Sequence, residues 1–161
     1  MSFDLSVHLA TERMPKPQEW QAAITRHGFH LRIDTDFDAS THSGCLPCEY
    51  KGEAAGFEYD YAVLDNEELH ELEVPQPLPC MISFSASMRV RNDFLSEVIA
   101  AAVLTEITGG LLVDPQEGRR HESADVIRWA KELELTDNSP RALPEEKNPE
   151  SASSKPWWKF W

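Results

Sequence analysis

Two sets of residues in this sequence have types and spacings that could carry chemistry. The first is a set of carboxylates, which could bind a cation or a basic protein surface: Asp34, Asp36, Asp38, Glu58 and Asp60. The second is a set of nitrogen and sulfur ligands, which could hold a zinc ion tetrahedrally: His42, Cys45, Cys48 and Cys80. Each set can do its chemistry only if the fold brings its members together.

The carboxylates lie in segments whose pattern is typical of half-buried strands. Residues 31–38 and 57–63 each alternate apolar and polar side chains, which predicts two strands with one buried face. If these strands are neighbours in one sheet, the five carboxylates share its other face. Like charges on neighbouring strands repel each other by up to ~1 kcal/mol. Three interpretations therefore stay open: a solvated outer face, a site for a basic protein partner, and a metal site.

The triplet Asp34-x-Asp36-x-Asp38 also resembles the start of a calcium-binding EF-hand loop. Such a loop needs glycine at its sixth position and glutamate at its twelfth. This sequence has Ala39 and Cys45 there, so an EF-hand is excluded.

The histidine and cysteine set gives a second hypothesis, a small zinc-binding regulatory or accessory domain. Cys45 and Cys48 have the spacing of a zinc knuckle, and His42 precedes them by three residues. The other half of the site is incomplete, because Cys80 stands alone among prolines. The alternative is that the thiols are free and pack as small apolar residues. In that case we expect no cofactor.

Motifs of nucleophilic or cofactor-dependent catalysis do not occur in the sequence. There is no Gly-x-Ser-x-Gly, no phosphate-binding loop and no dinucleotide fingerprint, and the six histidines are scattered. We therefore expect a binding protein rather than an enzyme, with no catalytic residues.

The charge distribution narrows the class of partner. The 161 residues carry a net charge of −13, and residues 34–73 contribute −11 of it. No cluster of lysine and arginine is present that could neutralise phosphates, so we expect no nucleic-acid partner. The longest strongly apolar run, residues 98–104, is too short to span a membrane. No signal peptide is visible, and three cysteines do not form a disulfide framework, so we expect the cytoplasm.

The elements that must position these residues follow from the hydrophobic periodicity. Alternation predicts strands at residues 2–9, 31–38, 57–63, 81–88 and 111–113, with an irregular loop at 39–56 and an exposed connection at 65–80. Helical spacing predicts helices that begin near Pro17, Asn92 or Asp93, and Ser123. This order predicts an α+β fold, a mostly antiparallel sheet of about five strands with two or three helices on one face.

The C-terminal part has a different composition. We expect one domain over residues 1–135, followed by a disordered linker rich in proline, serine and glutamate over residues 136–156. The chain ends in an aromatic motif over residues 157–161, in which Trp157, Trp158 and Trp161 are candidate binding residues. This motif could contact its own domain, a second copy in a homodimer, or a partner for which the chain acts as an adaptor. It could also lie at a membrane interface, where tryptophan and lysine are favoured.

Two segments resemble small bacterial immunity-type proteins that are encoded beside secreted or polymorphic toxins. The first runs Gly44-Cys45-Leu46-Pro47, Gly52 and Gly56-Phe57-Glu58-Tyr59, and the second is residues 108–117, Thr-Gly-Gly-Leu-Leu-Val-Asp-Pro-Gln-Glu. The resemblance covers about half of the chain and consists of turn glycines and strand aromatics, so it assigns no catalytic residue.

The resemblance implies a cytoplasmic protein that neutralises a toxin by covering it. Immunity proteins hold their toxins through complementary surfaces, often acidic against basic, because opposite fields accelerate association. The leading hypothesis is therefore toxin binding through an acidic surface that contains Asp34, Asp36, Asp38, Glu58 and Asp60.

Overall fold

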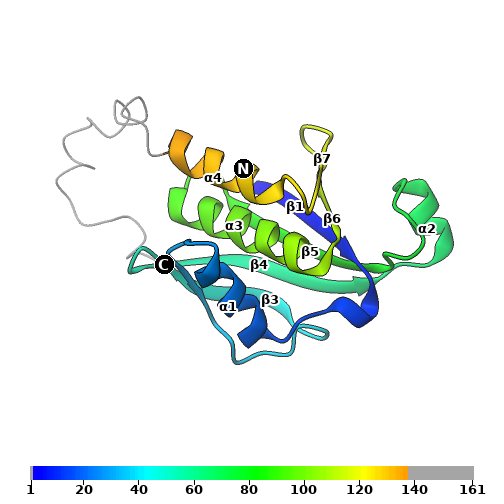
Figure 1. Cartoon of the computed structure of the whole chain (residues 1–161), viewed down its shortest axis with the longest axis horizontal. Coiled ribbons are helices and arrows are strands. Elements are labelled where there is room, and N and C mark those ends of the chain that lie inside the picture. Colours follow the sequence, from blue (N-terminus) through cyan, green and yellow to red (C-terminus); the bar gives the residue numbers. More distant parts are fainter. Residues whose placement is uncertain (1, 138–161) are drawn as a thin grey trace.

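A single antiparallel sheet organises the molecule, as the computed structural model of residues 2–137 shows (Figure 1). Its strands are β1 (Ser2–Leu9), β2 (Leu31–Ile33), β3 (Ser43–Tyr50), β4 (Glu53–Val63), β5 (Cys80–Ser87), β6 (Leu111–Asp114) and β7 (Arg119–Glu122). Their order in the sheet is β2-β3-β4-β5-β1-β6-β7, and every neighbouring pair is antiparallel.

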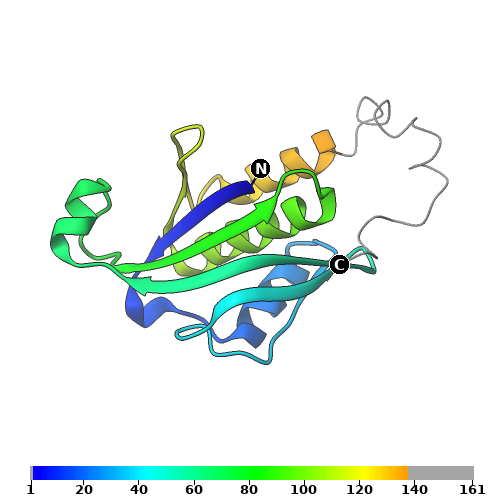
Figure 2. The same ribbon diagram turned by 180° about the vertical axis from the view of Figure 1, so that it is seen from behind.

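Three helices cover one face of the sheet. They are α1 (Pro17–Arg26), α3 (Arg91–Thr108) and α4 (Val126–Asp137), and α3 lies between the other two against the central strands. The short helix α2 (Asn66–Glu71) lies beyond one end of the sheet, and a 3-10 turn (Thr11–Arg13) precedes α1. In Figure 1 these helices lie in front of the sheet, and Figure 2, seen from behind, shows that they do not cover the opposite face.

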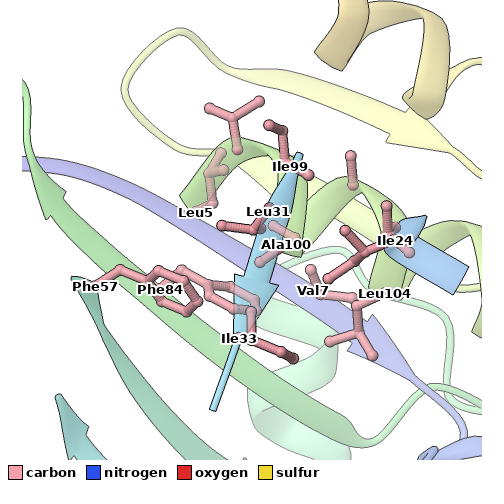
Figure 3. Close-up of a cluster of buried hydrophobic side chains, with 14 of the residues drawn as sticks. Leu5, Val7, Ile24, Leu31, Ile33, Phe57, Phe84, Ile99, Ala100 and Leu104 are labelled. Atoms are coloured by element: carbon pink, nitrogen blue, oxygen red, sulfur yellow. The ribbon is translucent and has the colours of Figure 1, made fainter. Parts of the chain in front are cut away.

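The core lies between the sheet and α3, because each strand turns alternate side chains toward the helices. Leu5, Phe57 and Phe84 from three strands meet Ile99 and Leu104 of α3 (Figure 3). Residues 95–105 of α3 are all buried, which agrees with the mainly apolar composition of this stretch on all sides. The helices and the inward residues of the strands therefore form one hydrophobic layer.

The α+β class and the helices on one face confirm the sequence prediction, whereas the strand and helix counts differ from it. The sheet has seven strands instead of about five, and the described residues contain four α-helices. The predicted loop at 39–56 is wrong, because β3 and the first residues of β4 fill most of it. Pro47 indicated a loop, yet its carbonyl accepts the N–H of Asp34 at 3.1 Å just beyond the end of β2. The N–H and C=O of one residue point to the same side of a strand, so an N–H at position 47 would point toward β2. Because β2 has already ended there, the N–H that proline lacks is not needed for strand pairing.

The first strand of the predicted acidic pair is shorter than expected. The strand predicted for residues 31–38 ends at Ile33, and β2 pairs with β3 rather than with β4. The predicted adjacency of segments 31–38 and 57–63 is therefore wrong, because β3 lies between them.

The described residues end at the last residue of α4, Asp137, two positions beyond the predicted domain boundary at 135. The predicted linker beyond Asp137 and the aromatic motif with Trp157, Trp158 and Trp161 lie outside the described residues. Within residues 2–137, no helix combines the length and the apolar character that a membrane span requires.

Candidate functional site

The face of the sheet opposite α1, α3 and α4, here called the open face, gathers small polar and acidic side chains. Its central residues come from four neighbouring strands: Asp4 and Ser6 of β1, Ser83 and Ser85 of β5, Glu58 and Asp60 of β4, and Cys45 of β3. They alternate with the buried core residues of the same strands, so the pattern that builds the core also exposes this surface.

The strand register sets the rows of this face. Glu58 lies opposite Ser85, and Ser85 lies opposite Asp4 on the next strand. Because neighbouring strands are about 4.8 Å apart, the Glu58 and Asp4 backbones are about 10 Å apart with a serine between them. Asp60 lies in the next row, opposite Ser83. A hollow of about 260 Å³ opens between these rows.

The open face is acidic at its centre for a simple reason of composition. Strands β1, β3, β4 and β5 contain no lysine or arginine. Asp4, Glu58 and Asp60 are exposed, and within residues 2–137 none of them forms an ion pair. The Asp60 carboxylate accepts a hydrogen bond from the Ser43 hydroxyl. These carboxylates and the serine hydroxyls between them can accept or donate hydrogen bonds to a partner that lies flat on the sheet.

Asp34, Asp36 and Asp38 do not belong to this face. They lie in the loop between β2 and β3, where the Asp34 carboxylate accepts the N–H of Asp36 and the Asp38 carboxylate accepts the N–H of Ser40, each at 2.9 Å. Phe37 from the same loop packs edge-on against buried Tyr59, with ring centroids 5.5 Å apart. The loop therefore packs on the helix-covered side, beside the start of α1. The prediction that all five carboxylates share one surface is wrong, and only Glu58 and Asp60 share the open face.

The proposed zinc ligands are also separated. Cys45 is exposed on the open face and Cys48 is buried on the other side of β3, because residues three apart in a strand point to opposite faces. The ring of His42 packs against Phe37. The Cys80 thiol lies 3.2 Å from the hydroxyl of Tyr61. Among residues 2–137 no three metal-ligating side chains gather, so the second hypothesis lacks its site.

A second hollow, here called the splay pocket, adjoins the open face where β4 and β5 separate. Their pairing ends at Glu58 and Ser85, and the strands diverge beyond that row. Gly56 lies beyond the last paired row, and its N–H donates instead to the Asp93 carboxylate of α3, at 3.0 Å. The pocket has a volume of about 320 Å³, and its mainly apolar lining includes Cys45, Ala54, Ala55, Ala86, Ser87 and Asp93.

The electrostatics of the splay pocket follow from partial burial beside acidic groups. Burial raises the pKa of Asp93, and the hydrogen bond from Gly56 opposes that shift. The pKa of the Cys45 thiol is raised by burial and by the nearby charges of Glu58 and Asp93. The pocket therefore has an acidic rim and an apolar interior.

Sequence reasoning missed two buried titratable groups. Both carboxyl oxygens of Glu97 are buried within α3 with no hydrogen-bond partner, and burial raises its pKa to about 10, with smaller contributions from Asp4 and Asp114. His8 is buried on the open-face side of β1, and burial together with the charge of Arg120 lowers its pKa to about 4. The signal for Glu97 was a carboxylate within the otherwise mostly apolar middle of α3, residues 95–104. Both groups are neutral at pH 7.

Comparison with models of protein families, with curated proteins and with solved structures finds no match for this chain.

Proposed function

We propose that the chain is a non-enzymatic binding protein that holds a basic surface of another protein against the open face. The observation that carries this proposal is the set of exposed carboxylates of Asp4, Glu58 and Asp60, which have no ion-pair partner among residues 2–137 and lie on strands without lysine or arginine. Such a face attracts a basic partner over a long range and accelerates encounter.

The shape and composition of the face support a protein partner rather than a small metabolite. Its carboxylates lie on two strands, β1 and β4, on either side of β5, and the small serine side chains of β5 between them leave room for long lysine and arginine side chains. Arginine binds carboxylates through two parallel hydrogen bonds. Several such contacts across the sheet would both attract the partner protein and fix its orientation on the open face.

The sequence resemblance to immunity-type proteins gives the partner an identity that can be tested. We propose that the partner is a bacterial toxin domain with a basic surface, and that the chain neutralises it in the cytoplasm by covering that surface. Glu58 and Asp60 remain in the proposed interface, whereas Asp34, Asp36 and Asp38 are withdrawn from it.

The test is co-expression of the chain with the product of the gene beside its own. We expect a complex on size-exclusion chromatography, protection of the cells, and an affinity that falls as salt is raised. Glu58→Lys combined with Asp60→Lys should weaken binding by about 100-fold or more and abolish protection, because truncating or reversing close interface charges removes 2–5 kcal/mol.

A matched control separates this face from overall charge. Asp36→Lys combined with Glu132→Lys makes the same change in net charge at two exposed positions on the helix-covered side. We expect this pair to change affinity less than about threefold, since exposed charges away from an interface act weakly. Equal effects of the two double variants, or the absence of any complex, would overturn the proposal.

A further inference from the structure

We propose that the splay pocket is the docking site of the chain's own aromatic tail, residues 157–161. One indole ring would enter the apolar interior between β4 and β5, and Lys159 would lie beside the carboxylates of Asp93 and Glu58. This inference concerns a second site and stands independently of the proposed partner.

The pocket fits a side chain of this chemistry. Its volume of about 320 Å³ is at the lower end for ligand pockets, which suits one aromatic ring system. Ala54, Ala55 and Ala86 provide apolar walls, while Asp93 provides a carboxylate at the edge. Aromatic residues bury large areas on binding, and a neighbouring lysine adds a favourable charge contact at an acidic rim.

The path of the chain brings the tail to the pocket. Helix α4 runs antiparallel to α3, so its last residues lie at the end of the sheet where α3 begins (Figure 1). The hydroxyl of Tyr50 at the end of β3 donates a hydrogen bond to the Glu134 carboxylate of α4. At the same end, the Asn92 amide of α3 donates to the Glu53 carboxylate of β4 at 2.9 Å. The last described residue, Asp137, therefore lies at the end of the molecule that holds the pocket.

The length of chain after α4 is sufficient for docking within one molecule. Nineteen residues, 138–156, separate α4 from the tail, and they span at most about 65 Å when extended. A tethered ligand of this kind experiences an effective concentration in the millimolar range. Weak binding by one ring and one charge is then enough to keep the pocket occupied.

The charges of the two parts are complementary. Glu58 and Asp93 line the pocket, and the lining contains no lysine or arginine. Residues 155–161 carry Lys155 and Lys159 and no acidic residue. The tail is therefore the strongly aromatic and basic segment of an otherwise acidic chain.

Cys45 provides a built-in probe of occupancy, because its exposed thiol lines the pocket whereas the thiols of Cys48 and Cys80 are buried. The full chain is treated with N-ethylmaleimide, which is uncharged, and modification of each cysteine is followed by mass spectrometry. We expect Cys45 to react about tenfold faster when the four tail aromatics are changed together, W157A, W158A, F160A and W161A. Tenfold protection corresponds to an effective concentration about ten times the dissociation constant.

Cys48 serves as the matched control for unfolding, because it lies on the same strand and faces the core. If the tail covers the pocket, Cys48 reactivity stays unchanged in the tail variant. A parallel rise in Cys48 reactivity would mean that the tail stabilises the whole fold instead, and an unchanged Cys45 rate would mean that the pocket is not covered. Either result overturns the proposal.

The rate of Cys45 modification also tests the role of Lys159, whether docking occurs within one chain, and whether the tail sequence itself binds. Lys159→Glu should raise the Cys45 rate about threefold, whereas Lys147→Glu, the same change within residues 138–156, should not. Protection of the unaltered chain should persist on dilution, since loss on dilution would assign the contact to a second copy and contradict docking within one chain. A synthetic peptide of residues 155–161 should restore protection to the tail variant, and failure to protect at saturating peptide would contradict the site.

Discussion

The two faces of the sheet differ in what they contribute, although the same strands build both. On the covered face, Leu5, Phe57 and Phe84 pack against α3 in a continuous core. On the open face, Glu58 and Asp60 alternate with those core residues and remain exposed. Packing is therefore concentrated on the covered side, and the side chains of the open side are not constrained by burial in the core.

Each face also holds one buried group that departs from its surroundings. Glu97 is a carboxyl group in the apolar layer of the covered face, and His8 is an imidazole buried on the open-face side. Burial disfavours the charged form of both groups, which raises the carboxyl pKa and lowers the imidazole pKa. The two groups should therefore give the protein opposite dependences on pH.

The largest effect is expected from Trp20→Ala on the covered face. Trp20 is 1% exposed, and its indole N–H donates to the carbonyl of Ala100 at 3.1 Å. Removal of the ring should lower the free energy of unfolding by about 3–5 kcal/mol, measured by urea denaturation. Trp20→Phe keeps most of the packing and should lose less. A loss below about 1 kcal/mol would contradict the assignment of stability to this face.

The second effect comes from Glu97. Its pKa is about 10 in the folded protein against an ordinary value of 4.5, so between these values the unfolded chain releases a proton that the folded chain keeps. The contribution to stability is therefore full below pH 4.5 and is lost as pH rises, by about 1.4 kcal/mol per unit. Glu97→Met should stabilise the protein by about 3 kcal/mol at pH 7 and remove the decline between pH 7 and 9.

Glu132→Met provides the control for this prediction, because Glu132 is exposed on α4. That variant should keep the decline in unfolding free energy between pH 7 and 9. An unaltered decline in Glu97→Met would show that Glu97 is ionised in the folded protein.

The third effect is expected from His8 at acidic pH. Its folded pKa of about 4 lies below the ordinary value of 6.5, so stability is full above pH 6.5 and is lost as pH falls toward 4. Between pH 7 and 5 this loss amounts to about 2 kcal/mol. Glu97 gains a similar amount over the same range, so the two contributions nearly cancel in the unaltered protein. His8→Gln should therefore become more stable from pH 7 to 5, whereas His70→Gln, at an exposed histidine of α2, should not.

Most of the covered face could be predicted from the sequence, because its residues follow regular periods. β1, β5 and α3 were predicted close to their observed bounds, since alternation and helical spacing are local signals. β3 was missed because Pro47 and the small residues before it, Ser43, Gly44 and Cys45, indicate a loop. Proline is tolerated there because β2 ends before it reaches Pro47, which the sequence does not reveal. β7, Arg119–Glu122, has no apolar alternation and is defined by its pairing with β6.

The candidate site was predicted less well, because it depends on which strands are neighbours. Glu58 and Asp60 were predicted correctly as outward residues of a strand. Asp34 and Asp38 have the same spacing as outward strand residues, yet their carboxylates cap local turns. Asp4 was not among the predicted site residues, since only the pairing of β1 with β5 places it in the same row as Glu58.

The smallest effect on stability is expected on the open face, and it tests the comparison most directly. Glu58→Gln and Asp60→Asn keep the shape of each side chain and remove its charge. Both carboxylates are exposed and repel each other weakly, so each variant should change the free energy of unfolding by less than about 0.5 kcal/mol, in the stabilising direction and only at low salt. Urea denaturation at two ionic strengths measures this. A loss above 1 kcal/mol would mean that these carboxylates hold the sheet together. If the expected result is found, the two charges have no role in stability. A large effect of Glu58→Lys with Asp60→Lys on partner binding would then result from lost contacts with the partner and not from a weakened fold.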